Sequence, residues 1–471
     1  MVSSESARHV GANGISSDQF WILTPTPPPP PEGPLKEHSE EYRSSIGVFE
    51  ETQPLRSAAI WGPPGAEAVL AGLYHPDDSL FHDRMFVSVA RAEIVGQREK
   101  DPESGFVFDL RQAGVHVTQV RNELAILLDR EAGKSDLTYD GVLQGLFKRA
   151  DEIMGQNYIF NPSKLNPRRN RRAKEEKPTF KVDVSRVAPR VKSDLRYLLE
   201  LDMALYGERA ALILNQALSL DEPMPLGNSL YARDQMNVIL GRRVRSNMAK
   251  QIRKGEVKHY EKVYNEVLGL DDPILIPERE TFEGGDAYVH NRTVYIGVGP
   301  RTSRGAAVHI FEQLSPQLEE AGMEFVMVED LHARYRDKKA AMDFMHLDTF
   351  SMPIGLNQIV VCKEEAERRH VFRIEKKGGS TNISDTEQSF IDFLESQGDD
   401  VILLSKKEQG DFGANFLVID ENTIFVPTAN NEGIIEALVA AGKTVKDVGL
   451  GECTKGYGAA HCMTGQLRRI E

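Results

Sequence analysis

Residues 287–296 read Ala287-Tyr288-Val289-His290-Asn291-Arg292-Thr293-Val294-Tyr295-Ile296, two short apolar runs on either side of an Asn-Arg pair. This pattern predicts a β-hairpin with its turn at the pair. A helical pattern follows over about 303–321, and a further apolar run at 324–328 is typical of a strand. Strands that alternate with helices in this way indicate an α/β architecture.

The same alternation covers much of the chain on both sides of this stretch. We expect ordered structure to begin near Leu55, and the repetition is structural because no sequence self-similarity accompanies it. Further helices are expected at about 85–97, 389–396 and 432–441, and further strands at 57–61, 115–120, 358–362, 401–404 and 444–448, with a hairpin over 415–426.

Two regions depart from the alternation. Residues 1–45 are rich in Ser and Gly at their start and contain a run of five prolines ending at Pro31, which favours polyproline II and builds no packed core. We expect a disordered tail there, a mobile extension rather than a docking motif for an aromatic groove. Residues 130–222 carry apolar residues at three-to-four spacing over 140–153 and 193–220, and we interpret this region as a helical insertion.

The α/β domain is therefore expected in two parts, 46–129 and 223–471, on either side of the insertion. Within the insertion, the basic run at 166–177 has no interleaved aromatic residues and ends in acidic ones, which favours an exposed loop over a nucleic-acid site. The chain of 471 residues carries a net charge of -14, and this argues against nucleic acid as a partner because phosphate binding needs a basic face. A negative protein instead attracts small cations, although salt screens this.

Cysteine content and hydropathy indicate the cellular setting. The three cysteines, Cys362, Cys453 and Cys462, are too few and too odd in number for a disulfide framework, which favours a reducing compartment. No apolar run approaches the roughly 18 residues that span a bilayer. The N-terminus lacks the basic-then-apolar pattern of a secretory signal. We therefore expect a cytoplasmic protein that does not enter the membrane.

Cys462 lies in the sequence His461-Cys462-Met463-Thr464 and is best interpreted together with three upstream segments. These segments are Tyr231-Ala232-Arg233-Asp234, Glu283-Gly284-Gly285-Asp286 and Met345-His346-Leu347-Asp348-Thr349. Together they offer a thiol, an imidazole and several carboxylates. Attack on a guanidinium needs these groups: carboxylates hold the planar cation, a thiolate reaches its carbon, and an imidazole protonates the leaving amine and then activates water.

Each segment also has an ordinary structural explanation. A lone cysteine is usually a buried apolar side chain. His346 and Asp348 alone would be a hydrogen-bonded pair, and the Glu-Gly-Gly-Asp sequence alone would be a turn. The presence of all four segments in this order is the stronger signal, and it favours guanidine chemistry.

These segments resemble, in kind and order, those of the arginine deiminase family of the guanidine-modifying (pentein) superfamily, over about residues 55–471. The resemblance implies a five-bladed α/β propeller with a helical insertion, and a reaction without metal or organic cofactor. The matching segments are Asn228–Asp234, Met248–Lys250 with Arg253 and Glu256, Glu283–Asp286, Arg301–Ser303, His346–Thr349 and His461–Thr464.

The resemblance implies five catalytic residues. Cys462 would attack the guanidinium carbon, while Asp234 and Asp348 would hold the guanidinium nitrogens. His346, oriented by Glu283, would act as general acid and then as general base. Ammonia would leave a tetrahedral adduct, and water would hydrolyse the resulting S-alkylthiouronium to release citrulline.

The resemblance also implies five substrate-binding residues. Arg253 and Arg301 would pair with the α-carboxylate of a free amino acid, and Asn228, Tyr231 and Asp286 would contribute to the pocket. A site built to pair a carboxylate selects for one, because a buried unpaired carboxylate is costly. This favours free L-arginine over agmatine or a peptide side chain, with surface salt bridges as the alternative role for the two arginines.

One loop departs from the family pattern. Members usually carry an Arg in the Gly-rich loop before the nucleophile, and here the loop reads Lys455-Gly456-Tyr457-Gly458-Ala459-Ala460-His461, with Tyr457 at the expected place. Another guanidino acid therefore remains open as the substrate.

Residues 453–457 loosely resemble the segment before the nucleophile of amidinotransferases, which pass the amidino group to an amine, although the Glu283–Asp286 and Met248–Lys250 segments favour the deiminase. A non-catalytic binding protein is an alternative from another class. The family often forms assemblies, which implies a homo-oligomer.

Overall fold

The computed structural model describes residues 47–48, 50–72, 87–96, 103–132, 138–155, 159–160, 180–181, 184–206, 209, 227–250, 253–332, 344–427 and 431–469. All of them fall within one compact unit, residues 38–471. The expected tail at 1–45 and the expected basic loop at 166–177 lie outside the described residues.

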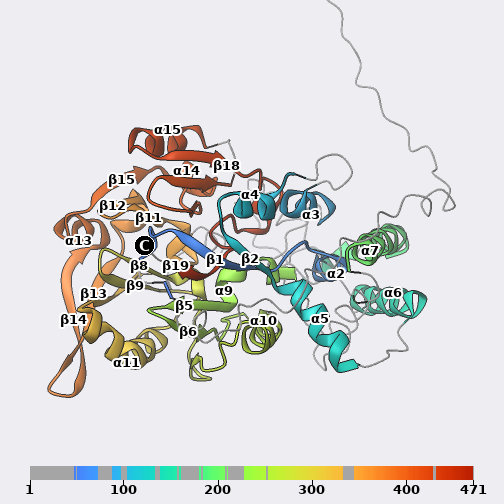
Figure 1. Ribbon diagram of the computed structural model, residues 1–471, viewed down its shortest axis with the longest axis horizontal. Coiled ribbons are helices and arrows are strands. Elements are labelled where there is room, and N and C mark those ends of the chain that lie inside the picture. Colours follow the sequence, from blue (N-terminus) through green and yellow to red (C-terminus); the bar gives the residue numbers. More distant parts are fainter. Residues whose placement is uncertain are drawn as a thin grey trace, which may run out of the picture. The chain divides into compact units, whose positions relative to one another are not determined.

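The elements are labelled in Figure 1. The strands are β1 (Leu55–Ile60), β2 (His116–Gln119), β3 (Ile159–Phe160), β4 (Phe180–Lys181), β5 (Met236–Ile239), β6 (Arg242–Arg245), β7 (Ile274–Leu275), β8 (Ala287–His290), β9 (Thr293–Val298), β10 (Glu324–Glu329), β11 (Ser351–Gly355), β12 (Gln358–Cys362), β13 (His370–Lys377), β14 (Ser380–Ser389), β15 (Asp400–Leu404), β16 (Leu417–Val418), β17 (Thr423–Val426), β18 (Thr444–Asp447) and β19 (Gly465–Arg469). The α-helices are α2 (Ala66–Gly72), α3 (Val87–Val95), α4 (Phe106–Gln112), α5 (Val120–Ala132), α6 (Tyr139–Gly155), α7 (Val184–Tyr206), α9 (Ala232–Gln235), α10 (Lys254–Glu266), α11 (Arg304–Ala321), α12 (Lys363–Ala366), α13 (Phe390–Ser396), α14 (Lys406–Gly410) and α15 (Glu432–Ala440). Four single turns of 3₁₀-helix are η4 (Gly227–Leu230), η6 (Gly284–Asp286), η9 (Leu347–Thr349) and η10 (Cys453–Gly456).

Five sheets repeat one arrangement, in which an antiparallel pair of strands is followed by a strand parallel to the second. The five units are β5–β6–β7, β8–β9–β10, β11–β12–β15, β16–β17–β18 and β19–β1–β2. In each unit at least one helix separates the last two strands along the chain, as parallel strands require. The predicted α/β fold is confirmed. The described strands form separate sheets, and none of these sheets closes on itself.

The predicted hairpin at 287–296 is β8 and β9, and its turn has the geometry that such a sequence needs. Asn291 and Arg292 both have positive φ, 47° and 58°, as in the turns whose twist matches that of the flanking strands. Helix α11 then begins after Ser303, whose side chain accepts from the main-chain N–H of Ala306, and it ends at Gly322 in the left-handed region. Strand β10 returns parallel to β9.

The helices of the expected insertion pack on the first part of the chain. Apolar side chains of α6 and α7 form a cluster with those of α2, separate from the cores of the sheets. At one end of this cluster, buried Asp202 of α7 accepts from Arg91 of α3 at 2.6 Å and from Arg121 of α5 at 2.5 Å. A buried ion-pair group therefore ties α7 to α3 and α5.

Two local predictions differ from the structure. The helix expected at 193–220 is α7, which begins nine residues earlier and is described only to Tyr206. Pro189 lies inside this helix, where a proline removes one main-chain hydrogen bond. The hairpin β13–β14 was not expected at all. Its outer half is polar and largely exposed, so it carries little of the apolar alternation from which strands are predicted.

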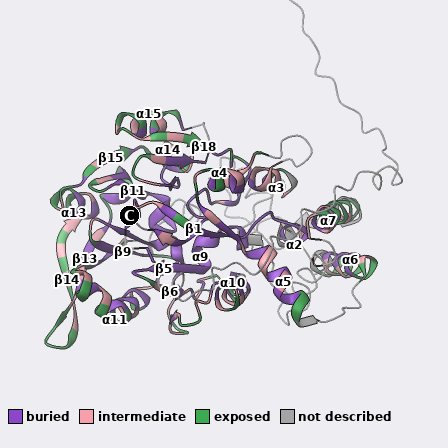
Figure 2. Ribbon diagram, in the orientation of Figure 1, coloured by how far each residue is buried: buried purple, intermediate pink, exposed green. Residues whose placement is uncertain are grey.

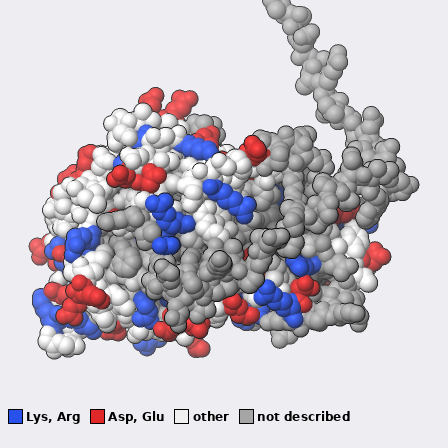
Figure 3. Space-filling view, viewed as in Figure 1, with Lys and Arg blue, Asp and Glu red and all other residues white. Residues whose placement is uncertain are grey.

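Several strands are buried, whereas several helices are partly exposed. Figure 2 shows β1, β5 and β9 as buried, whereas α6, α7, α11, α13 and α15 each present an exposed side. On the face drawn in Figure 3, Lys and Arg side chains of the described residues are interspersed with Asp and Glu. Among the described helices, none combines the length and the apolar character that crossing a lipid bilayer requires.

Candidate active site

The polar groups of the candidate site share one position in the repeated unit, directly before its first strand. They are Asp234 before β5, Glu283 and Asp286 before β8, His346 and Asp348 before β11, Asn415 before β16, and Cys462 before β19. The five predicted catalytic residues are each at most 3% exposed. The same position in five units thus supplies one buried polar cluster.

Cys462 is held at the end of the loop that precedes β19. Its thiol donates to Asp348 Oδ2 at 3.6 Å and accepts from Asn415 Nδ2 at 3.1 Å. Burial, followed by the negative charges of Asp348 and Asp234, raises the pKa of the Cys462 thiol well above its ordinary value. The thiol is therefore protonated at neutral pH until a cation enters beside it.

Asn415, which the sequence analysis did not identify, uses its whole side-chain amide in this loop. Its Oδ1 accepts from the main-chain N–H groups of Ala459 at 3.0 Å and Cys462 at 3.2 Å. Its Nδ2 also donates to the carbonyl oxygen of Asp348 at 3.1 Å. One buried amide thus joins the loop that carries Cys462 to the segment that carries Asp348.

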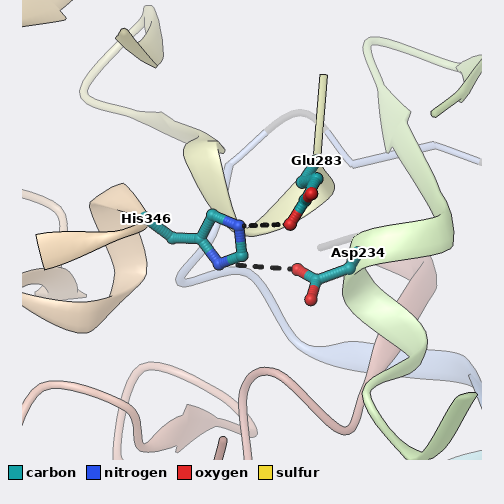
Figure 4. Close-up of side chains that lie close together, drawn as sticks. All are labelled: Asp234, Glu283 and His346. Atoms are coloured by element: carbon teal, nitrogen blue, oxygen red, sulfur yellow. Dashed lines mark hydrogen bonds and ion pairs between the residues drawn. The ribbon is translucent and has the colours of Figure 1, made fainter. Parts of the chain in front are cut away.

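His346 lies between two carboxylates, as Figure 4 shows. Its Nε2 is 3.0 Å from Glu283 Oε2, and its Nδ1 is 3.6 Å from Asp234 Oδ1. Burial lowers the pKa of His346, but the Asp234 charge and the hydrogen bond to Glu283 outweigh it and raise the pKa to about 9. The imidazole is therefore charged at neutral pH and ready to donate a proton.

The two glycines of the Glu-Gly-Gly-Asp sequence allow this approach. A Cβ on Gly285 would lie 2.7 Å from His346 Nδ1, and a Cβ on Gly284 would overlap the carbonyl oxygen of Arg233. With no side chain at Gly285, its main-chain N–H donates to Asp234 Oδ1 at 3.3 Å. The sequence therefore needs glycine at both positions for packing.

Glu283 is the ionised partner of His346. Its Oε1 accepts from the main-chain N–H of Ala249 at 3.1 Å and lies 3.5 Å from Arg301 Nη1. Burial raises the pKa of Glu283, but the charge of Arg301 and the hydrogen bond from His346 bring it below its usual range. Glu283 thus stays charged and fixes the orientation of the ring.

The guanidinium of Arg253 binds protein groups on three sides. It donates to Asp234 Oδ2 at 2.7 Å, to Glu256 Oε2 at 3.0 Å and to the carbonyl oxygen of Asn228 at 3.2 Å. These bonds occupy the Nε–H and one N–H of each terminal nitrogen, so an α-carboxylate, its expected ligand, has only the remaining N–H groups to bind. Burial raises the pKa of Glu256 to about 7 even beside this cation.

The other expected pocket residues have defined partners too. Tyr231 donates to the carbonyl oxygen of Cys453 at 2.9 Å, and its ring fills the space where a Cβ on Gly456 or Gly458 would stand. Tyr231 therefore supports the loop that leads to Cys462. Asn228 lies in η4, and its carbonyl oxygen is the acceptor for Arg253.

Asp286 faces the other side of the His346 segment. Its Oδ1 accepts from the main-chain N–H of Leu347 at 3.0 Å, and it lines a cavity together with His346, Asp330 and Arg369. Burial raises the pKa of Asp286 to about 7. Its observed contacts place it as a support of the His346 segment.

Asp234, Glu283 and His346 also form the one group among the described residues in which metal-ligating atoms lie within 4.8 Å of one another. Arg253 Nη1 already lies 2.7 Å from Asp234 and 3.6 Å from Glu283. Because a guanidinium stands against both carboxylates, we interpret this group as an ion-pair network.

His461 and Glu51 are two further buried residues that the sequence analysis did not select. His461 Nδ1 is 2.7 Å from Asp348 Oδ2, and its Nε2 is 3.1 Å from Glu51 Oε1. The position of His461 next to the nucleophile was the available signal. Glu51 gave none, because 410 residues separate it from its histidine.

A buried thiol among carboxylates and a charged imidazole, carried by an α/β fold, defines a protein of the guanidine-modifying class. The sequence model described as "Arginine deiminase" matches residues 214–469, more than half of the chain. The protein belongs to the arginine deiminase family.

Individual relatives are more distant. The chain is 24% identical over 247 residues to the uncharacterized protein YkgA of Bacillus subtilis (strain 168), which covers 52% of this chain and 72% of that protein. Among solved structures, SxtG, an amidinotransferase from Microseira wollei, is 15% identical with a TM-score of 0.46, covering 91% of this chain and 98% of that one. A DDAH mutant from Pseudomonas aeruginosa complexed with citrulline is 19% identical with a TM-score of 0.38, covering 53% and 78%.

Proposed function

We propose that the protein hydrolyses free L-arginine to L-citrulline and ammonia through a covalent intermediate on Cys462. The observation that supports this most is the position of the buried Cys462 thiol 3.6 Å from Asp348, with the imidazole of His346 held by Glu283 and Asp234 in the same cluster. Family membership supports the same reaction class.

In the proposed reaction, the substrate guanidinium lies between Asp234 and Asp348. Burial and the two carboxylates raise the pKa of the thiol, so a bound cation that neutralises the carboxylates favours the thiolate. The thiolate attacks the guanidinium carbon and its proton passes to solvent. Protonated His346 then donates a proton to one amino group, and the C–N bond breaks to release ammonia.

The second half of the reaction returns the enzyme to its starting state. The S-alkylthiouronium remains on Cys462, and His346 is now neutral. A water molecule gives a proton to His346 as its oxygen bonds to the carbon, and the C–S bond then breaks. Citrulline leaves, and a proton from the adduct restores the thiol. No proton or electron remains unaccounted for.

Substrate access requires movement, because the reacting side chains are almost completely buried. Arg253 is also part of this requirement. Its guanidinium contacts Asp234 Oδ2, one of the atoms that we propose to bind the substrate, so Arg253 shifts toward the α-carboxylate or shares Asp234 when arginine binds. Arg301, beside Glu283, is the second proposed carboxylate ligand.

We also propose how the five strand units are arranged. Five units with one strand order, each placing a polar residue before its first strand, support a five-bladed α/β propeller with the site where the units meet. Pairing of β19 with β1 supports closure of the ring between the ends of residues 46–129 and 223–471. The separate core of α6 and α7 supports a helical insertion over 130–222.

The test is to incubate purified protein with L-arginine, without an amine acceptor, and to measure ammonia and citrulline together. Equal amounts of both establish the deiminase. If neither forms, the proposed substrate is wrong. The next assay then uses other guanidino acids and, for amidino transfer, a panel of acceptor amines. The reason for this choice is Tyr457, which has a φ of 66° and lies in the loop where relatives usually have Arg.

A further inference from the structure

Two consecutive glutamates before β1 each bind a buried histidine. Glu51 Oε1 lies 3.1 Å from Nε2 of His461, whose Nδ1 lies 2.7 Å from Asp348 Oδ2. Glu51, His461 and Asp348 are all 0% exposed. Because Asp348 also accepts from the Cys462 thiol, an unbroken chain of contacts runs from Glu51 to the nucleophile.

Both ring nitrogens of His461 face carboxylate oxygens, Nδ1 that of Asp348 and Nε2 that of Glu51. A carboxylate that is ionised only accepts hydrogen bonds, and a neutral imidazole has only one N–H to donate. Burial raises the pKa of Glu51, but the charges of Arg233 and Arg469 and the bond from His461 bring it below the usual range. The pKa of Asp348 is likewise lowered, since the hydrogen bond from His461 outweighs burial. Because ionised carboxylates only accept, both contacts are hydrogen bonds only when each ring nitrogen of His461 carries a proton.

We propose that His461 is a positioning residue which, held charged by Glu51, orients Asp348 and places a fixed cation next to the Cys462 thiol. It is distinct from His346, the proposed proton donor, which contacts Glu283 and Asp234. The inference rests on the proposed function only where Asp348 touches the substrate. The proposed effect of His461 on the Cys462 thiol does not depend on catalytic turnover.

The consequence is a change in pH dependence. The charged and titratable groups that face this chain are Arg233, Arg469 and His346, with Asp234 near the thiol. An opposite charge within hydrogen-bond distance lowers the pKa of a carboxylate by about 1–3 units. Loss of the imidazolium therefore raises the pKa of Asp348, and it also raises the pKa of the Cys462 thiol.

The chain contains a matched control. His290 lies between Glu50, 3.4 Å from Nδ1, and Asp399, 2.8 Å from Nε2. It is as deeply buried as His461 and also lies between two carboxylates, although only its Nε2 is hydrogen-bonded, and no contact with the Cys462 cluster involves it among the described residues. A substitution that acts only by removing buried ion pairs has the same effect at His290 as at His461.

The experiment compares the wild type with His461→Asn and His290→Asn. The first readout is alkylation of Cys462 by iodoacetamide across pH, followed by peptide mass spectrometry, which needs no substrate. The second is the pH profile of kcat/KM with L-arginine. Thermal unfolding establishes that each variant is folded, and Glu51→Gln, which removes the far end of the chain, is the second variant if His461→Asn does not fold.

We expect His461→Asn to shift both the alkylation profile and the acidic limb of kcat/KM upward by about one pH unit or more, and we expect no shift for His290→Asn. Unchanged profiles in a folded His461→Asn, or equal shifts in the two variants, overturn the inference. If the wild type shows no turnover, the proposed function fails by itself, and the alkylation profiles still decide the role of His461.

Discussion

The side-chain amide of Asn415 binds Cys462 twice: Nδ2 donates to the thiol at 3.1 Å, and Oδ1 accepts from the main-chain N–H at 3.2 Å. Few side chains can do both, because this requires a donor and an acceptor on one planar group. In the proposed reaction, the Cys462 thiolate is thus given a fixed position and a hydrogen-bond donor.

Replacing Asn415 with Ala removes both contacts and the link to the Asp348 segment. A hydrogen bond to a charged group contributes about 1.5–3 kcal/mol, so we expect kcat/KM to fall roughly 10- to 100-fold. Steady-state kinetics measure this loss. Asn422→Ala, in the exposed turn between β16 and β17, is the control. Wild-type kcat/KM in Asn415→Ala would show that the amide does not assist the nucleophile.

Replacing Cys462 with Ala should abolish turnover while substrate affinity stays within about tenfold, because the carboxylates and arginines bind the substrate. Calorimetric titration with L-arginine and a citrulline assay measure the two quantities. The control is Cys362→Ala, whose thiol is buried in β12 away from the cluster. The nucleophile assignment is wrong if Cys462→Ala retains more than a few per cent of the wild-type rate.

Replacing Gly285 with Ala places a Cβ 2.7 Å from His346 Nδ1 and 3.1 Å from Asp234 Oδ1. The ring has to move, and a displacement of about 1 Å at a catalytic group costs about 100-fold in rate. We expect that loss in kcat with little change in thermal stability. Gly299→Ala is the control, since a Cβ there has no atom within 4 Å. Equal activity of the two variants would falsify the close approach.

Arg301 is proposed to bind the substrate α-carboxylate and also stabilises ionised Glu283. Arg301→Ala should therefore reduce activity on any guanidino substrate, and it should reduce kcat/KM for L-arginine far more than for agmatine, which lacks the carboxylate. The ratio of the two kcat/KM values isolates carboxylate recognition from the shared effect on Glu283. A ratio equal to that of the wild type removes the case for this contact.

The Glu50–His290–Asp399 group makes stability depend on pH. Burial lowers the pKa of His290, but hydrogen bonds to Asp399 and Glu50 raise it to about 9, above the ordinary value of about 6.5. The protonated histidine thus stabilises the fold fully below about pH 6.5, and this stabilisation is lost as pH rises through about 9. Urea unfolding should show His290→Asn losing up to about 3 kcal/mol near pH 6 and much less near pH 10. A loss that is the same at both pH values would contradict the charged state of His290.

Much of the fold follows from local sequence patterns. The hairpin β8–β9, helix α11 and strand β10 were predictable because their periodicity, turn residues and caps agree. The hairpin β13–β14 was not, because an exposed polar hairpin lacks the apolar alternation that identifies strands.

The candidate site contains some residues that local sequence patterns identify and others that they do not. Residues in short recognisable segments, such as His346 and Cys462, were identified from the sequence. Asn415 and Glu51 act through partners that are 47 and 410 residues away, and no local pattern records such distances. The contact of Arg253 with Glu256 is a local one, three residues away, whereas its contact with Asp234 of α9 spans 19 residues and follows no local pattern.

The pairing of β1 with β19 has a consequence for how the protein is made. Glu51 and Gln466 are hydrogen-bonded although 415 residues separate them, and Cys462 lies directly before β19. A polypeptide still in synthesis has no partner for β1, no partner for Glu51 and no nucleophile. Under the proposed function, nascent chains that lack β19 have no deiminase activity, and a single proteolytic cut between Asn415 and Cys462 that releases β19 abolishes that activity.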